Sequence, residues 1–215
     1  FNNEYWPAHY FIDTQGRIRA HHFGEGDYDK SERVIQTLLK EAGYQNVPGG
    51  IVNPDAKGTF AAADESDMDS PETYLGYGRG RNFASGAPSM DRAANYQTPY
   101  PLQPNQWGLS GRWIIGEQKD VLDRAGGKIT FRFHARDLHL VLGPASGGTP
   151  VRFKVTLDGQ PPGDNHGVDI DADGNGTVTS QRLYQLIRQP NGVADHTFSV
   201  QFLDPGVEAY SFTFG

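Results

Sequence analysis

The chain of 215 residues has a formal net charge of −7 and no basic run, which argues against binding to a nucleic-acid backbone. With 36% hydrophobic residues it can build an ordinary core, yet no apolar run is long enough to cross a bilayer. It contains no cysteine, which excludes disulfides, thiolate chemistry and cysteine-bound metals within this chain.

The first predicted elements are two strands joined by a tight turn. Residues 8–13 alternate well enough for a strand, with Tyr10 and Ile12 on one face, and residues 17–23 are expected to return beside them. The sequence DTQG between them is typical of a turn, and it places Gly16 where a positive φ is needed. These features predict a β-hairpin.

A helix is predicted directly after the hairpin. Asp29, with Glu32 three residues later, has the spacing of a capping box, and Gly43 is a natural stop. Between them, apolar residues recur at helical spacing and form one stripe: Val34, Ile35, Leu38, Leu39 and Ala42. The order of strand, strand and helix is therefore expected for residues 1–43.

The middle of the chain is rich in glycine and proline. Residues 44–69 are predicted to be a surface linker, because they lack a periodic apolar pattern. The next stretch, SPETYLGYG, has a local helix signature, with Ser70 as the cap and Pro71 at the first helical position. Its apolar side chains are expected to dock on a neighbouring domain: Tyr74, Leu75 and Tyr77.

From Trp107 onward the apolar pattern has a period of two. The sequence KITFRFHA places Ile129, Phe131 and Phe133 on one face and Thr130, Arg132 and His134 on the other. The stretches LHLVL, VRFKVTL, FSVQF and YSFTF repeat this alternation at intervals of about ten residues. The pattern predicts an antiparallel β-sandwich.

Two stretches resemble a known family. The sequences YWPAHYFIDTQGRIRAHHFGEGDY (residues 5–28) and SPETYLGYGRGRNF (residues 70–83) are similar to DipZ-type extracytoplasmic thioredoxin-like proteins. The resemblance implies an α/β plus all-β fold class. It assigns 1–43 to the C-terminal half of a thioredoxin-like fold, 44–69 to a linker, and 70–215 to a jelly-roll or galactose-binding-like sandwich resembling a carbohydrate-binding module, with an N-terminal docking segment.

The resemblance also implies a partner-binding site and a missing half. Trp6 and Pro7 match the step that carries the family's cis-proline, and Gly24 matches the glycine beside the substrate groove. The family's Cys-x-x-Cys motif lies in the half that precedes this proline, so the chain is expected to be a C-terminal piece that is inactive alone. In the parent protein, the expected partners are that half and a membrane electron-transfer domain.

Two classes of function follow from this resemblance. In the first, the chain is part of a thiol-disulfide oxidoreductase that lies outside the cytoplasmic membrane and is tethered to it. In the second, the sandwich is a non-catalytic module that binds a glycan or a cell-envelope polymer. Aromatic candidates for a flat sugar-binding face are Tyr96, Tyr100, Trp107, Trp113 and Tyr184, although packing in the core is an alternative, above all for Trp113. No cofactor is expected.

The string DIDADGNGT is the strongest metal-like motif. Its Asp169, Asp171, Asp173 and Asn175 alternate as the ligands of calcium loops do. The position where an EF-hand needs glutamate holds Ser180 or Arg182 instead, so a polar hairpin turn is favoured over a calcium site.

Two further expectations follow, the first from the residues and the second from the resemblance. If residues 136–137 form a two-residue loop, His134 and His139 face each other on one sheet surface, although surface histidines without a third ligand seldom bind metal. The truncated thioredoxin-like half would leave an unpaired strand edge and an uncovered apolar face. Self-association through residues 1–43 is therefore expected.

Overall fold

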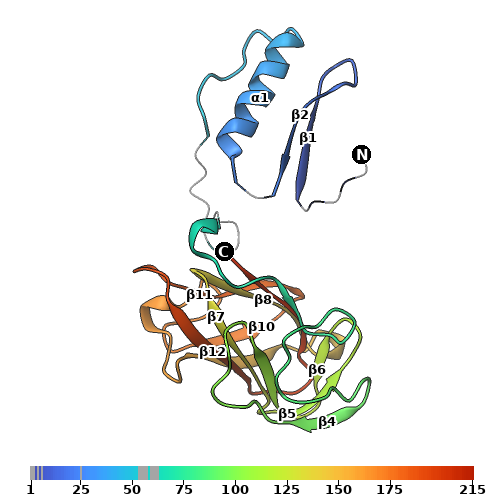
Figure 1. Ribbon diagram of the computed structural model, residues 1–215, viewed down its shortest axis with the longest axis vertical. Coiled ribbons are helices and arrows are strands. Elements are labelled where there is room, and N and C mark those ends of the chain that lie inside the picture. The colour runs from blue at the N-terminus through green and yellow to red at the C-terminus, as the bar shows by residue number, and fades with distance from the viewer. Residues whose placement is uncertain (1–2, 4, 6, 25, 53–57, 59–62) are drawn as a thin grey trace. The chain divides into compact units, whose positions relative to one another are not determined.

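The computed structural model divides the chain into two units, Phe1–Ala63 and Asp64–Gly215. It describes residues 3, 5, 7–24, 26–52, 58 and 63–215. Figure 1 labels the helix and most of the strands of these units. In the part of the chain that is described, no helix has the length and apolar character needed to span a membrane.

The first unit contains the predicted hairpin. Strands β1 (Ala8–Ile12) and β2 (Ile18–Phe23) pair antiparallel and form a two-stranded sheet. The turn between them closes through the Asp13 carboxylate, which accepts hydrogen bonds from the backbone N–H groups of Gln15 and Arg17, each at 3.0 Å. The hydrogen bond from the Arg17 backbone is the main cause that lowers the pKa of Asp13 to about 2.

Helix α1 (Tyr28–Glu41) follows the hairpin and is joined to it by an ion pair of Arg19 with Glu41 at 2.6 Å. The predicted Gly43 follows the C-cap residue Ala42, and its φ of +91° allows Tyr44 N–H to donate to the carbonyl of Leu39.

The predicted capping box at the start of α1 is wrong. The N-cap is Asp27 in a left-handed conformation, without a side-chain cap, and Asp29 lies inside the first turn. Glu32 accepts hydrogen bonds from Gln36 and from the backbone N–H of Val52 instead. Local propensity placed the helix correctly, but its first residue depends on the glycine-rich turn before it.

The second unit is built from antiparallel strands. They are β3 (Thr73–Tyr74), β4 (Ala93–Tyr96), β5 (Trp107–Ile115), β6 (Asp120–Leu122), β7 (Lys128–His134), β8 (Asp137–Gly143), β9 (Val151–Leu157), β10 (Asn175–Val178), β11 (Arg182–Arg188), β12 (Asp195–Phe202) and β13 (Glu208–Phe214). Three short 3-10 helices are η2 (Glu65–Asp67), η3 (Ser146–Gly148) and η4 (Gly163–Asn165). The five strands expected from the alternating stretches are all present.

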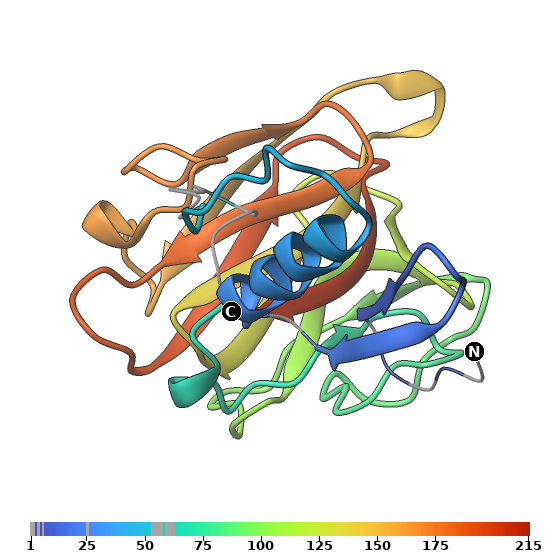
Figure 2. The same ribbon diagram turned by 90° about the horizontal axis from the view of Figure 1, so that it is seen from above.

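These strands form one curled sheet in two layers, in the order β10-β9-β12-β7-β5-β6-β13-β8-β11 (Figures 1 and 2). Strand β5 belongs to both layers. It pairs with β7 through residues 107–110, and with β4 and β6 through residues 111–115. The bend falls at Gly111, whose φ is +97° and where a Cβ atom would lie 2.9 Å from the Gly127 Cα. The chain can therefore cross from one layer to the other without a break in β5.

The core lies between the two layers. Phe131 on β7 packs on Phe212 of β13, with 4.9 Å between ring centroids, and Trp113 on β5 packs edge-on against Phe202 of β12 at 5.9 Å. All four rings are fully buried. This arrangement confirms the predicted β-sandwich.

The local helix predicted for SPETYLGYG does not form. Thr73 and Tyr74 instead pair with Phe212 and Ser211 of β13 and make strand β3. Leu75 is buried in the core, which supplies a tertiary contact that a surface helix would lack. Burial and ladder hydrogen bonds outweigh a weak local helix signature here.

One carboxyl group lies in this core without a partner. The Asp120 side chain on β6 is completely buried, and neither of its oxygens has a hydrogen-bond partner among the described residues. Burial raises its pKa from 3.8 to about 8. The folded state therefore binds this proton more tightly than the unfolded state does. The contribution of Asp120 to stability is thus greatest below pH 4 and falls as the pH rises toward 8.

We predict that Asp120→Asn stabilises the protein at pH 8 by a few kcal/mol and has little effect at pH 4. Urea unfolding of wild type and Asp120→Asn between pH 4 and pH 8 measures the difference in their free energies of unfolding. Buried His139 has the opposite pH dependence, but it is present in both proteins and its effect cancels in this difference. The exposed Asp164→Asn variant is the control and should follow the wild-type profile. Equal gains at both pH values would contradict the assignment.

Candidate functional site

Strand β7 presents a polar face on the side away from the core. Its Ile129, Phe131 and Phe133 are buried, while Thr130 and Arg132 alternate with them and face outward. The same alternation holds in β9 and β12, which lie beside β7 in the same layer. The outer side of this layer is therefore lined by polar side chains.

Three hydroxyl groups form a row across these strands. Ser199 on β12 lies opposite Thr130 on β7 and opposite Thr156 on β9. The hydroxyls of Thr130 and Ser199 are 2.7 Å apart and hydrogen-bonded. Because each hydroxyl can both donate and accept, the row offers donors and acceptors to a polar ligand.

A loop that precedes β5 forms a wall above this row. Thr98 anchors the loop, because its backbone N–H donates to the Ser110 hydroxyl at 3.1 Å and its own hydroxyl accepts from Ser110 at 3.0 Å. Farther along, Arg132 donates to the carbonyl oxygen of Leu102 at 3.3 Å. Between these anchors Tyr100 is 91% exposed, so its ring is free to contact a ligand.

The row and the wall enclose a groove of about 540 Å³, within the size range of small-molecule sites. Its lining residues are Thr98, Pro99, Tyr100, Leu102, Lys128, Thr130, Thr156, Asp158, Gly159, Thr197 and Ser199. We call this site the hydroxyl groove. The alternation in KITFRFHA already placed Thr130 outward, but strand register was needed to bring Thr156 and Ser199 beside it.

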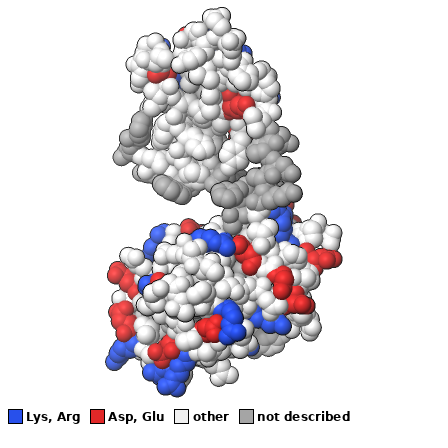
Figure 3. Space-filling model, turned by 180° about the vertical axis from the view of Figure 1, so that it is seen from behind, with Lys and Arg blue, Asp and Glu red and all other residues white. Residues whose placement is uncertain are grey.

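The charges at the hydroxyl groove are few and mixed. The Asp158 carboxylate accepts from the Thr197 backbone N–H at 2.8 Å and contacts Nδ1 of His196 at 2.6 Å. Lys128 is exposed. On the face of Asp64–Gly215 that Figure 3 shows, basic and acidic side chains are interspersed, so no single-sign patch dominates it.

A second cavity of about 450 Å³ lies beside strands β3 and β13, lined by Tyr74, Gly76, Gly78, Arg79, Glu117, Gln118, Tyr210 and Ser211. Its walls are tightly packed, because a Cβ atom at Gly76 would meet the backbone of Gln118 at 2.5 Å. The guanidinium of Arg79 already lies 3.6 Å from the centroid of the Tyr74 ring. That ring face is occupied, and the hydroxyl groove is the better candidate for ligand stacking.

The structure separates the five predicted aromatic candidates. Trp107, Trp113 and Tyr184 are buried, and their polar atoms bond within the fold: the two indoles to carbonyl oxygens, and the Tyr184 hydroxyl to residues 179 and 180. They offer no ring face to a sugar, and the prediction is corrected for these three. Tyr96 is half-buried, with its hydroxyl bonded to Ser89 N–H. Tyr100 alone among the five is exposed.

The predicted partner-binding residues lie in the first unit. Trp6 is outside the described residues, and with it the predicted cis bond to Pro7. Pro7 and Gly24 are brought together, since the Gly24 N–H donates to the Pro7 carbonyl at 2.9 Å. This contact closes the open end of the hairpin.

The predicted calcium string forms a turn that leads into β10. Asp171 accepts from the backbone N–H of Asn175 at 2.8 Å, and the Asp169 carboxylate pairs with Arg182 at 2.6 Å. Asp173 is exposed. The string lies in the long connection between the consecutive strands β9 and β10, which pair antiparallel, and its last residues belong to β10. The favoured polar turn between two strands is therefore observed, with a longer loop than that of a tight hairpin. Over the described ranges, no cluster of three or more His, Asp or Glu residues is placed to hold a metal ion.

The two histidines near residue 136 do not face each other. His134 ends β7, which pairs with β12 and β5, whereas His139 lies in β8, which pairs with β11 and β13. The connection crosses between layers instead of forming a two-residue hairpin. The burial of His139 lowers its pKa, and hydrogen bonds to Asp67 and Asp195 raise that of His134.

Comparison with known proteins gives one family match and two curated relatives. Residues 70–215 match the family described as the thioredoxin like C-terminal domain. The chain is 33% identical over 161 residues to Protein DipZ of Mycobacterium bovis (strain ATCC BAA-935 / AF2122/97) and, equally, to that of Mycobacterium tuberculosis (strain CDC 1551 / Oshkosh). The alignment covers 75% of this chain and 22% of each relative. The chain thus spans about a fifth of the length of these relatives.

Among solved structures, the chain is similar to a family two carbohydrate esterase from Cellvibrio japonicus, with a TM-score of 0.39 and 14% sequence identity. That alignment covers 50% of this chain and 30% of the esterase. A similarity at this level carries no argument about function.

Because Tyr100 is exposed and Trp107 is buried, truncating them should change the stability of the protein by very different amounts. Tyr100→Ala should change the free energy of unfolding by less than about 0.5 kcal/mol, because the ring is solvated. Trp107→Ala should cost about 3–5 kcal/mol, because it opens a cavity in the core. Urea unfolding of the two variants beside wild type tests this. A large loss in Tyr100→Ala would mean that its ring is packed in solution.

Proposed function

Because the chain belongs to the family of thioredoxin like C-terminal domains, we propose that its sandwich is a non-catalytic module that binds a polyhydroxylated ligand, a glycan of the cell envelope. The module would serve a longer thiol-disulfide oxidoreductase that lies outside the cytoplasmic membrane and is tethered to it. The observation that carries the proposal is the hydroxyl groove, with a row of three hydroxyls below an exposed tyrosine ring.

The groove has the chemistry that a sugar ring needs. A pyranose presents hydroxyls at its edge and an apolar face, which an aromatic ring such as that of Tyr100 can cover. Thr156 and Thr197 offer hydroxyls at the floor, and Asp158 supplies a carboxylate acceptor. The floor of the groove is held by backbone pairing of β7, β9 and β12, so it is formed before any ligand arrives.

The redox chemistry of this proposal comes from outside the chain. Without cysteine, none of its 215 residues can form or attack a disulfide. We propose that the first unit is the second half of a thioredoxin-like fold, in which Pro7 and Gly24 contact the redox partner. The order of hairpin and helix supports this reading.

The first unit also has the surface of an incomplete domain. None of its described residues from Asn3 to Val52 is buried, and Ile12, Ile18 and Ile35 are each exposed by 45% or more. A hairpin with one helix is marginal in water by itself. We propose that another chain segment, either the preceding thioredoxin-like half or a second copy, covers this surface.

For the chain as given, we therefore predict association through residues 1–43. Size-exclusion chromatography with light scattering should show a dimer, or a larger species, whose mass falls on dilution. Ile18→Lys, which places a charge on the exposed face, should shift the protein toward monomer, whereas Lys30→Gln on the helix should not. A stable wild-type monomer with protected amides across Tyr10–Phe23 would refute the prediction.

The binding proposal predicts an interaction with soluble polysaccharides. Affinity electrophoresis and calorimetry with hydroxyethylcellulose, galactomannan, arabinogalactan and polygalacturonate should show binding to at least one of them. Tyr100→Ala and Ser199→Ala should each weaken it by about tenfold, equivalent to about 1.4 kcal/mol. Tyr44→Ala, which removes an exposed tyrosine outside the groove, is the matched control. No binding to any of the four, or equal loss in the control, would overturn the proposal.

A further inference from the structure

The segment that enters the sandwich is fastened to the end of β7. The backbone N–H groups of Asp69 and Ser70 both donate to the carbonyl of His134, at 3.0 and 3.2 Å. In return, the His134 N–H donates to the Ser70 hydroxyl at 2.9 Å. One residue of β7 thus holds the entering segment through three backbone contacts.

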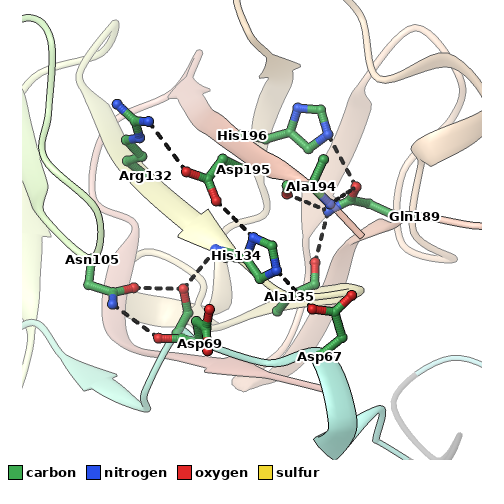
Figure 4. A network of polar contacts seen from close by, with 11 residues as sticks. Asp67, Asp69, Asn105, Arg132, His134, Ala135, Gln189, Ala194, Asp195 and His196 are labelled. Atoms are coloured by element: carbon green, nitrogen blue, oxygen red, sulfur yellow. Dashed lines mark hydrogen bonds and ion pairs between the residues drawn. The ribbon is translucent and has the colours of Figure 1, made fainter. Parts of the chain in front are cut away.

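The imidazole of the same residue lies between two carboxylates (Figure 4). Its Nδ1 is 2.8 Å from Asp195 on β12, and its Nε2 is 3.0 Å from Asp67 in η2. A carboxylate can only accept, so both contacts are hydrogen bonds only when both ring nitrogens carry a proton. A neutral imidazole has one N–H and must leave one carboxylate without a donor.

The contacts continue from this ring to the wall of the hydroxyl groove. Asp195 also pairs with Arg132 at 3.3 Å, and Arg132 donates to the Leu102 carbonyl in the loop that carries Tyr100. A second path reaches the end of the same loop, since Asn105 accepts from Ser70 at 2.7 Å and donates to the carbonyl of Asp69 at 3.1 Å. The entering segment and the groove wall are therefore held by one network.

We propose that His134, through Asp195 and Arg132, positions the Tyr100 wall of the hydroxyl groove, and that loss of its proton loosens both this wall and the segment at residues 67–70. The proposal rests on the function proposed above insofar as the loosened wall lowers ligand affinity. Arg132 and His134 are positioning residues here, since neither is required to touch the ligand.

The direction of the pH effect follows from the groups around the ring. Asp67 faces it from the entering segment and Asp195 faces it from β12. Asp69 and Arg132 line the same hollow as the ring. His196, the next residue on β12, lies opposite Phe133 and contacts Asp158 instead. Hydrogen bonds to Asp67 and then Asp195 raise the pKa of His134 above 6.5. The stabilisation is therefore complete below pH 6.5 and is lost as the pH rises through the folded-state value.

At acidic pH, the stability of the network is limited by protonation of Asp195. The hydrogen bond to His134 is the largest cause that lowers the pKa of Asp195 below 3.8, followed by the contact with Arg132. Its contribution is present above pH 3.8 and is lost only as the pH falls through that lower value. The network is consequently closed at mildly acidic pH and opens as the pH rises through the raised pKa of His134.

Amide hydrogen exchange tests the network without any ligand. In wild type, the protection factors of Ser70 and Asn105, divided by that of Phe131 in the core, should fall about tenfold between pH 6 and pH 9. In His134→Gln they should be low and independent of pH, and His21→Gln should repeat the wild-type profile. Equal profiles in wild type and His134→Gln, or a fall confined to Ser70, would overturn the proposal.

A binding arm separates this proposal from the proposed function. With the polysaccharide that binds best among hydroxyethylcellulose, galactomannan, arabinogalactan and polygalacturonate, wild-type affinity should fall about fivefold from pH 6 to pH 9, and that of His134→Gln should stay constant. Binding with an identical pH dependence in both proteins contradicts the positioning role alone. Absence of binding, together with the expected exchange profile, contradicts the glycan function and leaves the network in place.

Discussion

The packing of Phe131 on Phe212 joins the two layers of the sandwich at its centre, and much of the remaining structure depends on it. By fixing which side of β7 faces the core, this contact also fixes which side faces solvent. Thr130 and Arg132 therefore point outward because Phe131 points inward. The core and the hydroxyl groove are two sides of the same strand, and neither can change register without the other.

The two units depend on different sources of order. The sandwich buries rings on both of its layers and bonds the polar atoms of its tryptophans to backbone carbonyls, for example Trp107 to Arg81. The hairpin and helix are held by polar contacts at the surface, such as those of Asp13 and Glu41, and no described residue up to Val52 is buried. The sandwich supplies its own core, whereas the first unit leaves apolar side chains such as those of Ile12 and Ile18 exposed.

Local periodicity was enough to predict the hairpin, helix α1 and the long strands, because each signal lies within about ten residues. It failed for residues 70–78, where pairing with β13, more than 130 positions away, replaced the expected helix. It also failed at residues 135–136, since no local signal says whether a short connection joins neighbours in one layer or crosses between layers. The prediction of Asp29 as the helix cap also failed, because the helix begins two residues earlier, after a turn that the sequence pattern did not predict.

The site was also predictable only in part, because local sequence patterns do not show which strands lie side by side. Tyr100 was identified as an aromatic candidate, but its exposure, and the burial of Trp113 and Tyr184, are properties of the assembled layers. The hydroxyl row comes from β7, β9 and β12, whose side by side order places residues 130, 156 and 199 together. Alternation shows that Thr130 points outward, but it contains no information on which strand lies next to it.

Strand β5, which pairs with both layers on either side of Gly111, has a consequence for how the sandwich comes apart. Neither layer can open at its centre without breaking the hydrogen bonds that β5 gives to the other. Opening events short of complete unfolding should then begin at the outer strand β10, which pairs with β9, rather than at β11, whose second side bonds to residues 166–169. The two layers therefore unfold as one cooperative unit. A mechanical force applied to the chain where it enters the sandwich would be resisted by both layers.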